Sequence, residues 1–284
     1  MKKTGLLALM AISSLLLTGC PPKSGETGSG GTGSDGGEIL VGEYGSLTGA
    51  EATFGQSTHN GITMAVDEIN KAGGVLGRQI KVLTEDDQSK PEEAANAVTK
   101  LISQNNVIAV LGEVASSNSL AAAPICQSNK VPMITPSSTN ERVTKVGDYI
   151  FRMCFIDPYQ GEAMANYLVK DQKVTRAALL VDVKSDYSTG LAANFERTFL
   201  ANGGKIVGKQ NYAKGDSDFR AQLTSIKGTG PQIIYIPGYY NDIGQIAIQA
   251  RDLGMQMPLV GGDGWESPKL LEIGGKALEG CFYS

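Results

Sequence analysis

The chain has 284 residues, of which 41% are hydrophobic and 19% are charged, so it is long enough for one large or two modest globular domains. Its formal net charge of −4 argues against a nucleic-acid partner, because phosphate binding requires a basic surface. A single histidine leaves little for a metal centre or a histidine-dependent catalytic site. We therefore expect no metal and no other cofactor.

The N-terminus has the composition of an export signal. Lys2 and Lys3 precede an apolar run from Leu6 to Leu17, which is too short to span a bilayer as a mature helix. The run ends in LTGC, which resembles the lipobox of bacterial lipoproteins, where the leader is removed before a lipidated cysteine. We predict a signal peptide over residues 1–19 and a lipid on Cys20, with an ordinary secretory signal and a chance cysteine as the alternative.

Residues 20–37 are expected to form the lipidated end and a flexible tether, since glycine, serine and threonine dominate them. The tether contains GSGGTG, but no strand precedes this GxGxxG pattern and no helix follows it, so it predicts no dinucleotide site. Three cysteines remain beyond the tether, namely Cys126, Cys154 and Cys281. They allow at most one internal disulfide, whose pairing stays open, or three free thiols.

From Glu38 onward, short apolar runs alternate with segments of helical period. The first of these segments has one apolar helix face, formed by Ile62, Ala65, Val66 and Ile69. The pattern from Ser89 to Glu92 predicts a capping box at the start of the next helix. The expected strands are 39–41, 79–83, 107–111, 131–134, 176–182, 205–209, 232–236 and 258–260. The later helices are expected near 118–128, 139–146, 159–169, 189–201, 218–226 and 242–253. This alternation predicts an α/β protein of two lobes, each a mostly parallel sheet flanked by helices.

Hydroxyl side chains gather after two expected strands of the first half. The segments GEVASSNS and PSSTNE place Ser116, Ser137 and Thr139 where the carboxyl ends of parallel strands meet helix N-termini. Together with backbone N–H groups, such hydroxyls could bind a carboxylate without a cation. Helix capping is the competing explanation, particularly for Ser138, which lies three residues before Glu141 in a capping-box pattern.

The second half supplies different side chains at the equivalent strand ends. Tyr187, Tyr239 and Asp263 follow three of its expected strands. Aromatic faces and a carboxylate suit an ammonium group, through cation–π contact and an ion pair. Turn chemistry could also explain Asp263, and core packing could explain Trp265.

Catalytic patterns are weak in this sequence. It contains no G-x-S-x-G motif, and a Ser-His-Asp triad would require His59, which is expected to be a surface or capping residue on an early helix. We therefore expect no catalytic residues.

Several longer segments carry a family resemblance. GSLTGAEATFGQSTHNGITMAVDEINKAGG, LGEVASS, PSSTNERVT, YIFRMCFIDPYQG, GYYNDIGQIAIQARDLG and GGDGW occur in order between Glu38 and Ser284. They resemble the Leu/Ile/Val-binding family of periplasmic binding proteins, the receptors of ABC importers for branched-chain and related amino acids. The resemblance implies a type I periplasmic binding protein fold, with lobes over 38–156 and 157–284. Because members of this family continue further, it also implies a chain truncated at the C-terminus, with an incomplete first lobe.

The resemblance assigns roles to seven side chains. It implies that Ser116 and Thr139 bind the α-carboxylate of an amino acid, with help from Ser137. It places Asp263 on the α-ammonium group, although that position often holds Glu in branched-chain receptors, so the identity of the ligand stays open. The remaining positions are the two tyrosines of the second lobe, Tyr187 and Tyr239, and an aromatic residue that closes over the ligand from the first lobe, Phe54.

The expected function is an exported solute receptor that binds an amino acid between its lobes and delivers it to ABC permease subunits. The lipid on Cys20 would hold it at the outer face of the cytoplasmic membrane or in the periplasm. A sensory receptor for an amide or another small molecule is the first alternative, and an exported hydrolase is a remote one.

Overall fold

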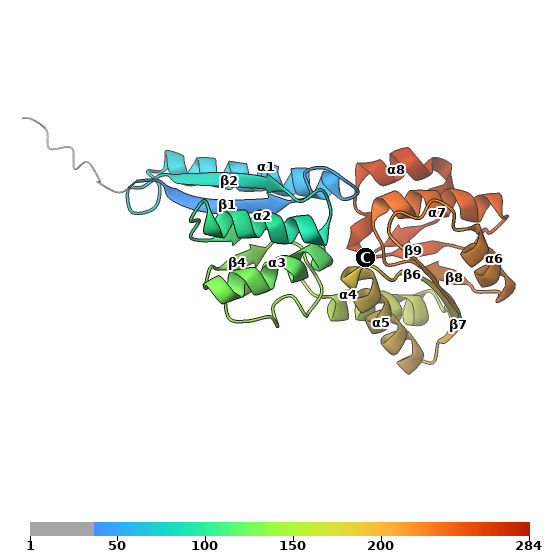
Figure 1. Cartoon of the computed structure of the whole chain (residues 1–284). Coiled ribbons are helices and arrows are strands. Elements are labelled where there is room, and N and C mark those ends of the chain that lie inside the picture. Colours follow the sequence, from blue (N-terminus) through green and yellow to red (C-terminus); the bar gives the residue numbers. More distant parts are fainter. Residues whose placement is uncertain (1–36) are drawn as a thin grey trace, which may run out of the picture. The chain divides into compact units, whose positions relative to one another are not determined.

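The computed structural model describes residues 37–284. The expected signal peptide, the lipidation site Cys20 and all but the last residue of the tether lie outside the described residues. The described part contains two five-stranded sheets, and every printed strand pair in them is parallel. In Figure 1, the elements of lobe 1 run from blue to green and those of lobe 2 from yellow to red. The expected α/β architecture with two parallel sheets is confirmed.

Lobe 1 is built on a sheet with the strand order β2-β1-β3-β4-β5. Its strands are β1 (Ile39–Gly45), β2 (Ile80–Asp86), β3 (Val110–Leu111), β4 (Met133–Thr135) and β5 (Ile150–Arg152). Its helices are α1 (Ala52–Lys71), α2 (Pro91–Ser103) and α3 (Ser116–Asn129). The hydroxyl residues lie on the loops that follow β3 and β4. Because these two strands are parallel neighbours, both loops lie at the same edge of the sheet, as expected.

Lobe 2 is built on a sheet with the order β10-β9-β8-β6-β7. Its strands are β6 (Arg176–Asp182), β7 (Lys205–Tyr212), β8 (Ile233–Tyr235), β9 (Leu259–Gly261) and β10 (Phe282–Tyr283). Its helices are α4 (Asp157–Asn166), α5 (Asp186–Ala201), α6 (Arg220–Gly228), α7 (Tyr240–Asp252) and α8 (Pro268–Gly274), and a π-helical turn (Tyr167–Asp171) continues α4. A 3₁₀ turn over Asp263–Trp265 follows β9, and a second over Gly275–Leu278 follows α8.

The two lobes differ in how completely their sheets are covered. In lobe 2, one buried cluster contains residues of α4 and α5 and another contains residues of α6, α7 and α8, so apolar side chains pack on both faces of the sheet. The buried cluster of lobe 1 contains residues of α2 and α3 but none of α1.

Helix α1 forms as expected, but its apolar face is not part of the core. Ile62, Ala65, Val66 and Ile69 line an apolar cavity of about 500 Å³ against β1 and β3, and the only buried residue of the helix is Gly55. The periodicity therefore predicted the helix and its apolar side correctly, while it overstated how deeply that side is buried.

The helix expected near 139–146 is absent, and this prediction was wrong. The segment forms turns, held by Arg152 of β5, whose Nη1 donates to the carbonyls of Ser138 and Asn140 at 2.7 and 2.8 Å. Arg152 Nη2 also donates to Thr144 Oγ1. Ser138 therefore caps no helix, and its hydroxyl bonds instead to Ser119 and to the carbonyls of residues 113 and 114.

The capping box expected at Ser89 is likewise wrong. Lys90 is the N-cap of α2 without a side-chain cap bond, and Pro91 occupies the first turn as expected. Ser89 has φ of 61°, and its hydroxyl links two loops by donating to Thr48 O and accepting from Glu51 N. Ser89 thus holds two loops together and does not cap α2.

The three cysteines of the described part are free thiols, with Cys126 buried and Cys154 and Cys281 half-buried. Burial raises the pKa of Cys126 to about 12 and that of Cys154 to about 11, so neither thiol is activated for nucleophilic chemistry. Among residues 37–284, no helix is long and apolar enough to cross a membrane.

Candidate ligand-binding site

Residues from both lobes line a cavity of about 170 Å³. The lining residues are Phe54, Val114, Ser137, Thr139, Tyr187, Tyr239, Asp263, Gly264 and Glu266. The structure thus brings together all of the sequence-predicted site residues except Ser116. Pockets of this kind, with a few convergent polar groups at strand ends of an α/β protein, are typical binding sites.

Lobe 1 contributes neutral hydroxyls. Ser137 and Thr139 follow β4, and the loop that carries them is fixed by Thr135. Thr135 Oγ1 accepts the backbone N–H groups of Ser137 and Ser138 at 3.3 and 2.9 Å, and donates to Glu113 O at 2.5 Å. The hydroxyl wall is therefore held by hydrogen bonds within lobe 1, before any ligand arrives.

Ser116 is the first residue of α3 and does not line the cavity. Its side chain is buried, and its Oγ accepts the backbone N–H of Asn140 at 3.2 Å, directly after Thr139. A hydroxyl that accepts one hydrogen bond can still donate another. In this structure, however, Ser116 supports the hydroxyl loop rather than facing the cavity.

Lobe 2 contributes a carboxylate in a fixed orientation. Asp263 begins the 3₁₀ turn after β9, and its Oδ1 accepts hydrogen bonds from Gln160 Nε2 at 2.9 Å and Tyr187 OH at 2.8 Å. Gln160 Oε1 accepts the backbone N–H of Asp263 in return, at 2.8 Å. The backbone N–H groups of Asp263 and Gly264 also stabilise this carboxylate, which lines the cavity.

Burial raises the pKa of Asp263, while the hydrogen bonds from Gln160 and Tyr187 act in the opposite direction. A cationic group in the cavity would favour the ionised form further, because opposite charges stabilise each other. Trp265 lies two residues on, is 1% exposed and donates its Nε1–H to Ile236 O at 3.0 Å. Core packing, the alternative considered for Trp265, is therefore its role here.

Aromatic rings form the remaining wall. The rings of Tyr187 and Tyr239 have centroids 5.1 Å apart and planes inclined by 32°. Phe54 of α1 packs edgewise against Tyr239 at 6.3 Å and Tyr240 at 5.4 Å, so an aromatic side chain of lobe 1 contacts lobe 2 at the cavity. The faces of tyrosine rings attract cations, which agrees with a carboxylate on the same side.

Sequence reasoning missed Gln160 and Glu266. Gln160 lies on α4, buried, and holds Asp263 from both its amide atoms. Nothing in the local pattern of α4 distinguishes it from a solvent-facing glutamine. Glu266 lies three residues after Asp263 and adds a second carboxylate to the wall of lobe 2.

A further acidic residue lies beside the hydroxyl loop. Asp157 begins α4, its backbone N–H donates to Thr139 O at 3.0 Å, and its side chain is 1% exposed. Neither carboxylate oxygen has a hydrogen-bond partner within the described part of the chain. Burial raises the pKa of Asp157 to about 7, the nearby Thr139 hydroxyl acts in the opposite direction, and the charge of Asp263 adds a smaller increase.

The arrangement suits reversible binding of a small molecule with an anionic and a cationic end. Among the described residues, no group of three or more His, Cys, Asp or Glu side chains could hold a metal ion. His59 is not among the residues that line the cavity. Its side chain is 41% exposed, as expected for a surface residue, and its Nδ1 lies 2.8 Å from Oε2 of the buried Glu43, so it pairs with that carboxylate and does not cap a helix.

Comparisons with known proteins place this geometry among solute-binding proteins. A family model described as "Periplasmic binding protein" matches residues 38–284. A Leu/Ile/Val-binding protein of Rhizobium johnstonii is 34% identical over 87% of this chain and 67% of its own length. A leucine-, isoleucine-, valine-, threonine- and alanine-binding protein of Pseudomonas aeruginosa is 33% identical over 85% of this chain and 65% of its own length.

Solved structures give the same result. A leucine binding protein from Thermotoga maritima superimposes with a TM-score of 0.82 at 41% identity, covering 86% of this chain and 69% of that one. A branched-chain amino acid transporter substrate binding protein from Streptococcus pneumoniae, solved in complex with isoleucine, gives a TM-score of 0.78 at 37% identity, covering 84% of this chain and 68% of that one. The chain thus spans about two thirds of the length of these relatives.

Proposed function

We propose that this chain, which belongs to the periplasmic binding protein family, is an extracytoplasmic receptor that binds an amino acid, branched-chain or related, between its two lobes. The observation that carries the proposal is the opposition of the two walls of the cavity. On lobe 1 the cavity is lined by the neutral hydroxyls of Ser137 and Thr139, and on lobe 2 by the carboxylate of Asp263, which Gln160 and Tyr187 orient. An α-amino acid presents one group complementary to each wall.

The α-carboxylate is assigned to lobe 1. Hydroxyl groups and backbone N–H groups donate hydrogen bonds to a carboxylate, and the N-terminus of α3 adds partial positive charge behind the loop. Ser116 contributes by fixing the loop through Asn140 N. The α-ammonium group is assigned to the carboxylate of Asp263 and the faces of Tyr187 and Tyr239, where a carboxylate and aromatic rings both favour a cation.

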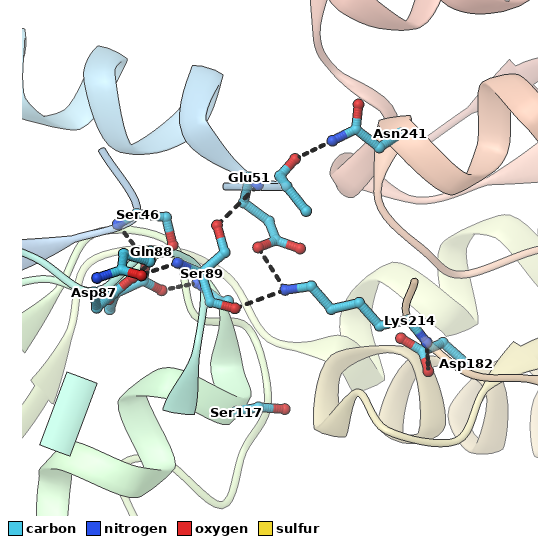
Figure 2. Close-up of polar contacts among 12 residues, drawn as sticks. Ser46, Glu51, Asp87, Gln88, Ser89, Ser117, Asp182, Lys214 and Asn241 are labelled. Atoms are coloured by element: carbon cyan, nitrogen blue, oxygen red, sulfur yellow. Dashed lines mark hydrogen bonds and ion pairs between the residues drawn. The ribbon is translucent and has the colours of Figure 1, made fainter. Parts of the chain in front are cut away.

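Contacts between the lobes link the binding of the ligand to closure. Figure 2 shows Lys214 of lobe 2 reaching Glu51 of lobe 1, with Nζ at 2.7 Å from Glu51 Oε2 and 2.9 Å from Ser89 O. In the same view, Asn241 Nδ2 donates to Ala50 O at 2.5 Å. A ligand that touches both walls makes all its contacts only when these lobes are together, so binding shifts the equilibrium toward the closed form.

Asp186 makes a second set of contacts between the lobes. Asp186 at the start of α5 accepts Ser117 Oγ at 3.0 Å and Arg142 Nη1 at 2.7 Å, and its carbonyl accepts Asn140 Nδ2 at 2.7 Å. We place the boundary of the lobes between residues 156 and 157, at the start of α4. The closed pair of lobes is the form that ABC permease subunits would recognise, and the lipid on Cys20 would keep it at the membrane.

A thermal-shift screen tests the proposal. We expect L-leucine, L-isoleucine or L-valine to raise the melting temperature, because a ligand at 100 times its Kd adds about 2.7 kcal/mol to the free energy of unfolding. Small amides and unrelated sugars serve as controls. Stabilisation by amides alone would favour the sensory alternative, and no stabilisation by any amino acid would contradict the proposal.

A further inference from the structure

A buried polar cluster lies beside the lobe 1 wall of the amino-acid cavity. Its members are Ser46, Asp87 and Glu113, which follow the ends of β1, β2 and β3 within two residues, and these three strands are neighbours in the sheet. The three residues are 0%, 0% and 1% exposed, and none of them lines the cavity. They can therefore act on a ligand only through the residues that they hold.

The contacts within the cluster require more protons than the Ser46 hydroxyl supplies. Ser46 Oγ lies 2.9 Å from Asp87 Oδ1 and 2.6 Å from Glu113 Oε1, and Figure 2 shows Ser46 beside Asp87. A hydroxyl has one proton to donate, so it can satisfy only one of these two oxygens. The second contact becomes a hydrogen bond when that carboxyl group donates a proton of its own to Ser46 Oγ. The geometry therefore indicates one proton on the Asp87–Glu113 pair.

The burial of the pair acts in the same direction. Burial raises the pKa of Glu113, and the charge of Asp87 raises it further. Burial also raises the pKa of Asp87, against the hydrogen bonds from Ser46 and from the backbone of Ser89. Two desolvated carboxyl groups that lie close together cannot both ionise at low cost, so the pair keeps a proton to a higher pH than separate groups would.

The surroundings of the pair offer it no counter-ion. The titratable side chains that act on it from the neighbouring elements are Asp86, Glu51, Tyr44 and Tyr239. None of these groups is a cation, and Lys214 of lobe 2 is already paired with Glu51. Within residues 37–284, neither Asp87 nor Glu113 forms an ion pair. A shared proton thus takes the place of a counter-ion.

Glu113 connects this cluster to both loops of the hydroxyl wall. Its Oε2 accepts the backbone N–H of Ala115, the N-cap of α3. Its backbone carbonyl accepts Thr135 Oγ1 at 2.5 Å and Ser138 Oγ at 2.9 Å. The cavity-lining residues next to these anchor points are Val114, Ser137 and Thr139. A displacement of Glu113 would therefore displace the wall.

Ser46 connects the cluster to the aromatic side chain that lobe 1 places at the cavity. A Cβ atom at Gly55 would lie 2.1 Å from the carbonyl oxygen of Ser46, so α1 packs directly on the backbone of Ser46 at this glycine. Phe54 precedes Gly55 and lines the cavity. Because Ser46 N donates to Glu113 Oε1 at 2.9 Å, the start of α1 is also linked to Glu113.

We propose that Asp87 and Glu113 share one proton and together act as positioning residues for the amino-acid site. With the proton in place, the pair holds the turn at Val114, the loop at Thr139 and the start of α1 in the arrangement that lines the cavity. Without the proton, repulsion between two buried negative charges would push these segments apart. The effect on amino-acid binding rests on the function proposed above, whereas the shared proton is a property of the chain alone.

Urea unfolding of the ligand-free chain between pH 6 and pH 8 tests the shared proton. Asp87→Asn replaces the protonated carboxyl group by an amide, which donates a hydrogen bond and does not titrate. The unaltered chain releases the shared proton on unfolding, because separate carboxyl groups ionise below this pH range. Its unfolding equilibrium constant should therefore rise about tenfold more per pH unit than that of Asp87→Asn.

Asp67→Asn is the matched control for this measurement. It removes an exposed carboxyl group on α1 and should keep the pH dependence of the unaltered chain. Glu113→Gln removes the other member of the pair and keeps the test valid if Asp87→Asn fails to fold. An equal pH dependence in the unaltered chain and in the variants of the pair overturns the shared proton.

Calorimetric titration with L-leucine at pH 7 tests the positioning role. We expect Asp87→Ala to weaken L-leucine binding about tenfold or more, because it leaves buried groups of the cluster without a partner. Asp87→Asn should restore the affinity, and Asp67→Ala should leave it unchanged. Ser46→Ala, which removes the hydroxyl between the two carboxyl groups, replaces Asp87→Ala if that variant fails to fold. Full affinity in Asp87→Ala, or a loss that Asp87→Asn does not restore, overturns the positioning role.

The methyl resonances of Val114 and Thr139 in NMR spectra report on the wall without a ligand. We expect both resonances to shift in Asp87→Ala and to return in Asp87→Asn. A chain that shows these shifts but binds no amino acid contradicts the function proposed above and leaves the positioning role standing. Resonances that stay in place in Asp87→Ala overturn the positioning role, whether or not L-leucine binds.

Discussion

The two walls of the amino-acid cavity differ in charge and in the way they are held. The wall of lobe 1 presents hydroxyls that are neutral at every relevant pH, on a loop fixed by backbone carbonyls, Thr135 and Arg152. The wall of lobe 2 presents Asp263, oriented by Gln160 and Tyr187, with Glu266 and aromatic rings beside it. This difference predicts that an amino acid binds in one direction, with its carboxylate at the hydrogen-bond donors of lobe 1 and its ammonium group at the negative charge of lobe 2.

Removing the charge of lobe 2 is expected to have the largest effect. Asp263→Ala should weaken an amino-acid ligand by about 3–5 kcal/mol, because it leaves a desolvated ammonium group unpaired. Isothermal titration calorimetry measures this loss directly. Asp252→Ala, which removes an exposed carboxylate elsewhere in lobe 2, is the control, and similar affinities for the two variants would remove Asp263 from the site.

Removing a hydroxyl of lobe 1 should cost less. Thr139→Val keeps the shape of the side chain and deletes its hydroxyl, which should weaken the ligand by about 1–3 kcal/mol by leaving its carboxylate short of a donor. Thr144→Val is the matched control on the same loop, since the Thr144 hydroxyl bonds only to Arg152 within the described part of the chain. We expect Thr144→Val to lower the melting temperature without changing ligand affinity. The assignment of the carboxylate to lobe 1 fails if the two variants bind equally well.

The buried carboxyl of Asp157, beside the loop that carries Thr139, should make the stability of the protein depend on pH. The folded-state pKa of Asp157 is about 7, above its unfolded value, so the folded protein holds the extra proton. Stability should therefore fall as pH rises, by about 1 kcal/mol between pH 6 and pH 7 from this group alone. Urea titrations of the unliganded chain and of Asp157→Asn should differ by this slope. Parallel stability curves would show that Asp157 ionises normally.

The aromatic part of lobe 2 should make the smallest contribution. Tyr239→Leu is expected to weaken the ligand by about 0.5–2 kcal/mol through loss of the ring face. Tyr239→Phe should bind as well as the unaltered chain, because it keeps the ring face to which the contribution is assigned. A loss on Tyr239→Phe that matches the loss on Tyr239→Leu would assign the contribution to the hydroxyl instead.

Much of the fold could be predicted because hydrophobic periodicity reports long elements well. The long helices α1, α5 and α7 and the strands β6 and β7 follow from apolar spacing alone. The short strands β5 and β10 were missed, whereas β3, β4, β8 and β9, which are equally short, lie within or next to the apolar runs from which strands were predicted. The helix expected near 139–146 failed because its capping pattern competes with Arg152, a residue of the missed strand β5.

The candidate site was predictable to the extent that it lies at strand ends. Ser137, Thr139, Tyr187, Tyr239 and Asp263 follow strands, so the topology of parallel sheets brings them to one cavity. Gln160 lies on a helix and acts through Asp263, so only the folded structure reveals it. Ser116 also follows a strand, but its hydroxyl accepts a hydrogen bond from the backbone of Asn140 and does not face the cavity. The orientation of this side chain could not be predicted from the sequence pattern.

The direction of the ligand is the central claim, and it can be tested with one cycle of titrations. L-leucine and 4-methylpentanoate, which is leucine without its ammonium group, are each titrated into the unaltered chain and into Asp263→Ala. We predict that Asp263→Ala weakens L-leucine by about 3–5 kcal/mol and leaves the affinity for 4-methylpentanoate unchanged or improved, because that ligand has no cation for the carboxylate to bind. An equal loss for both ligands would contradict the assignment of the ammonium group to lobe 2.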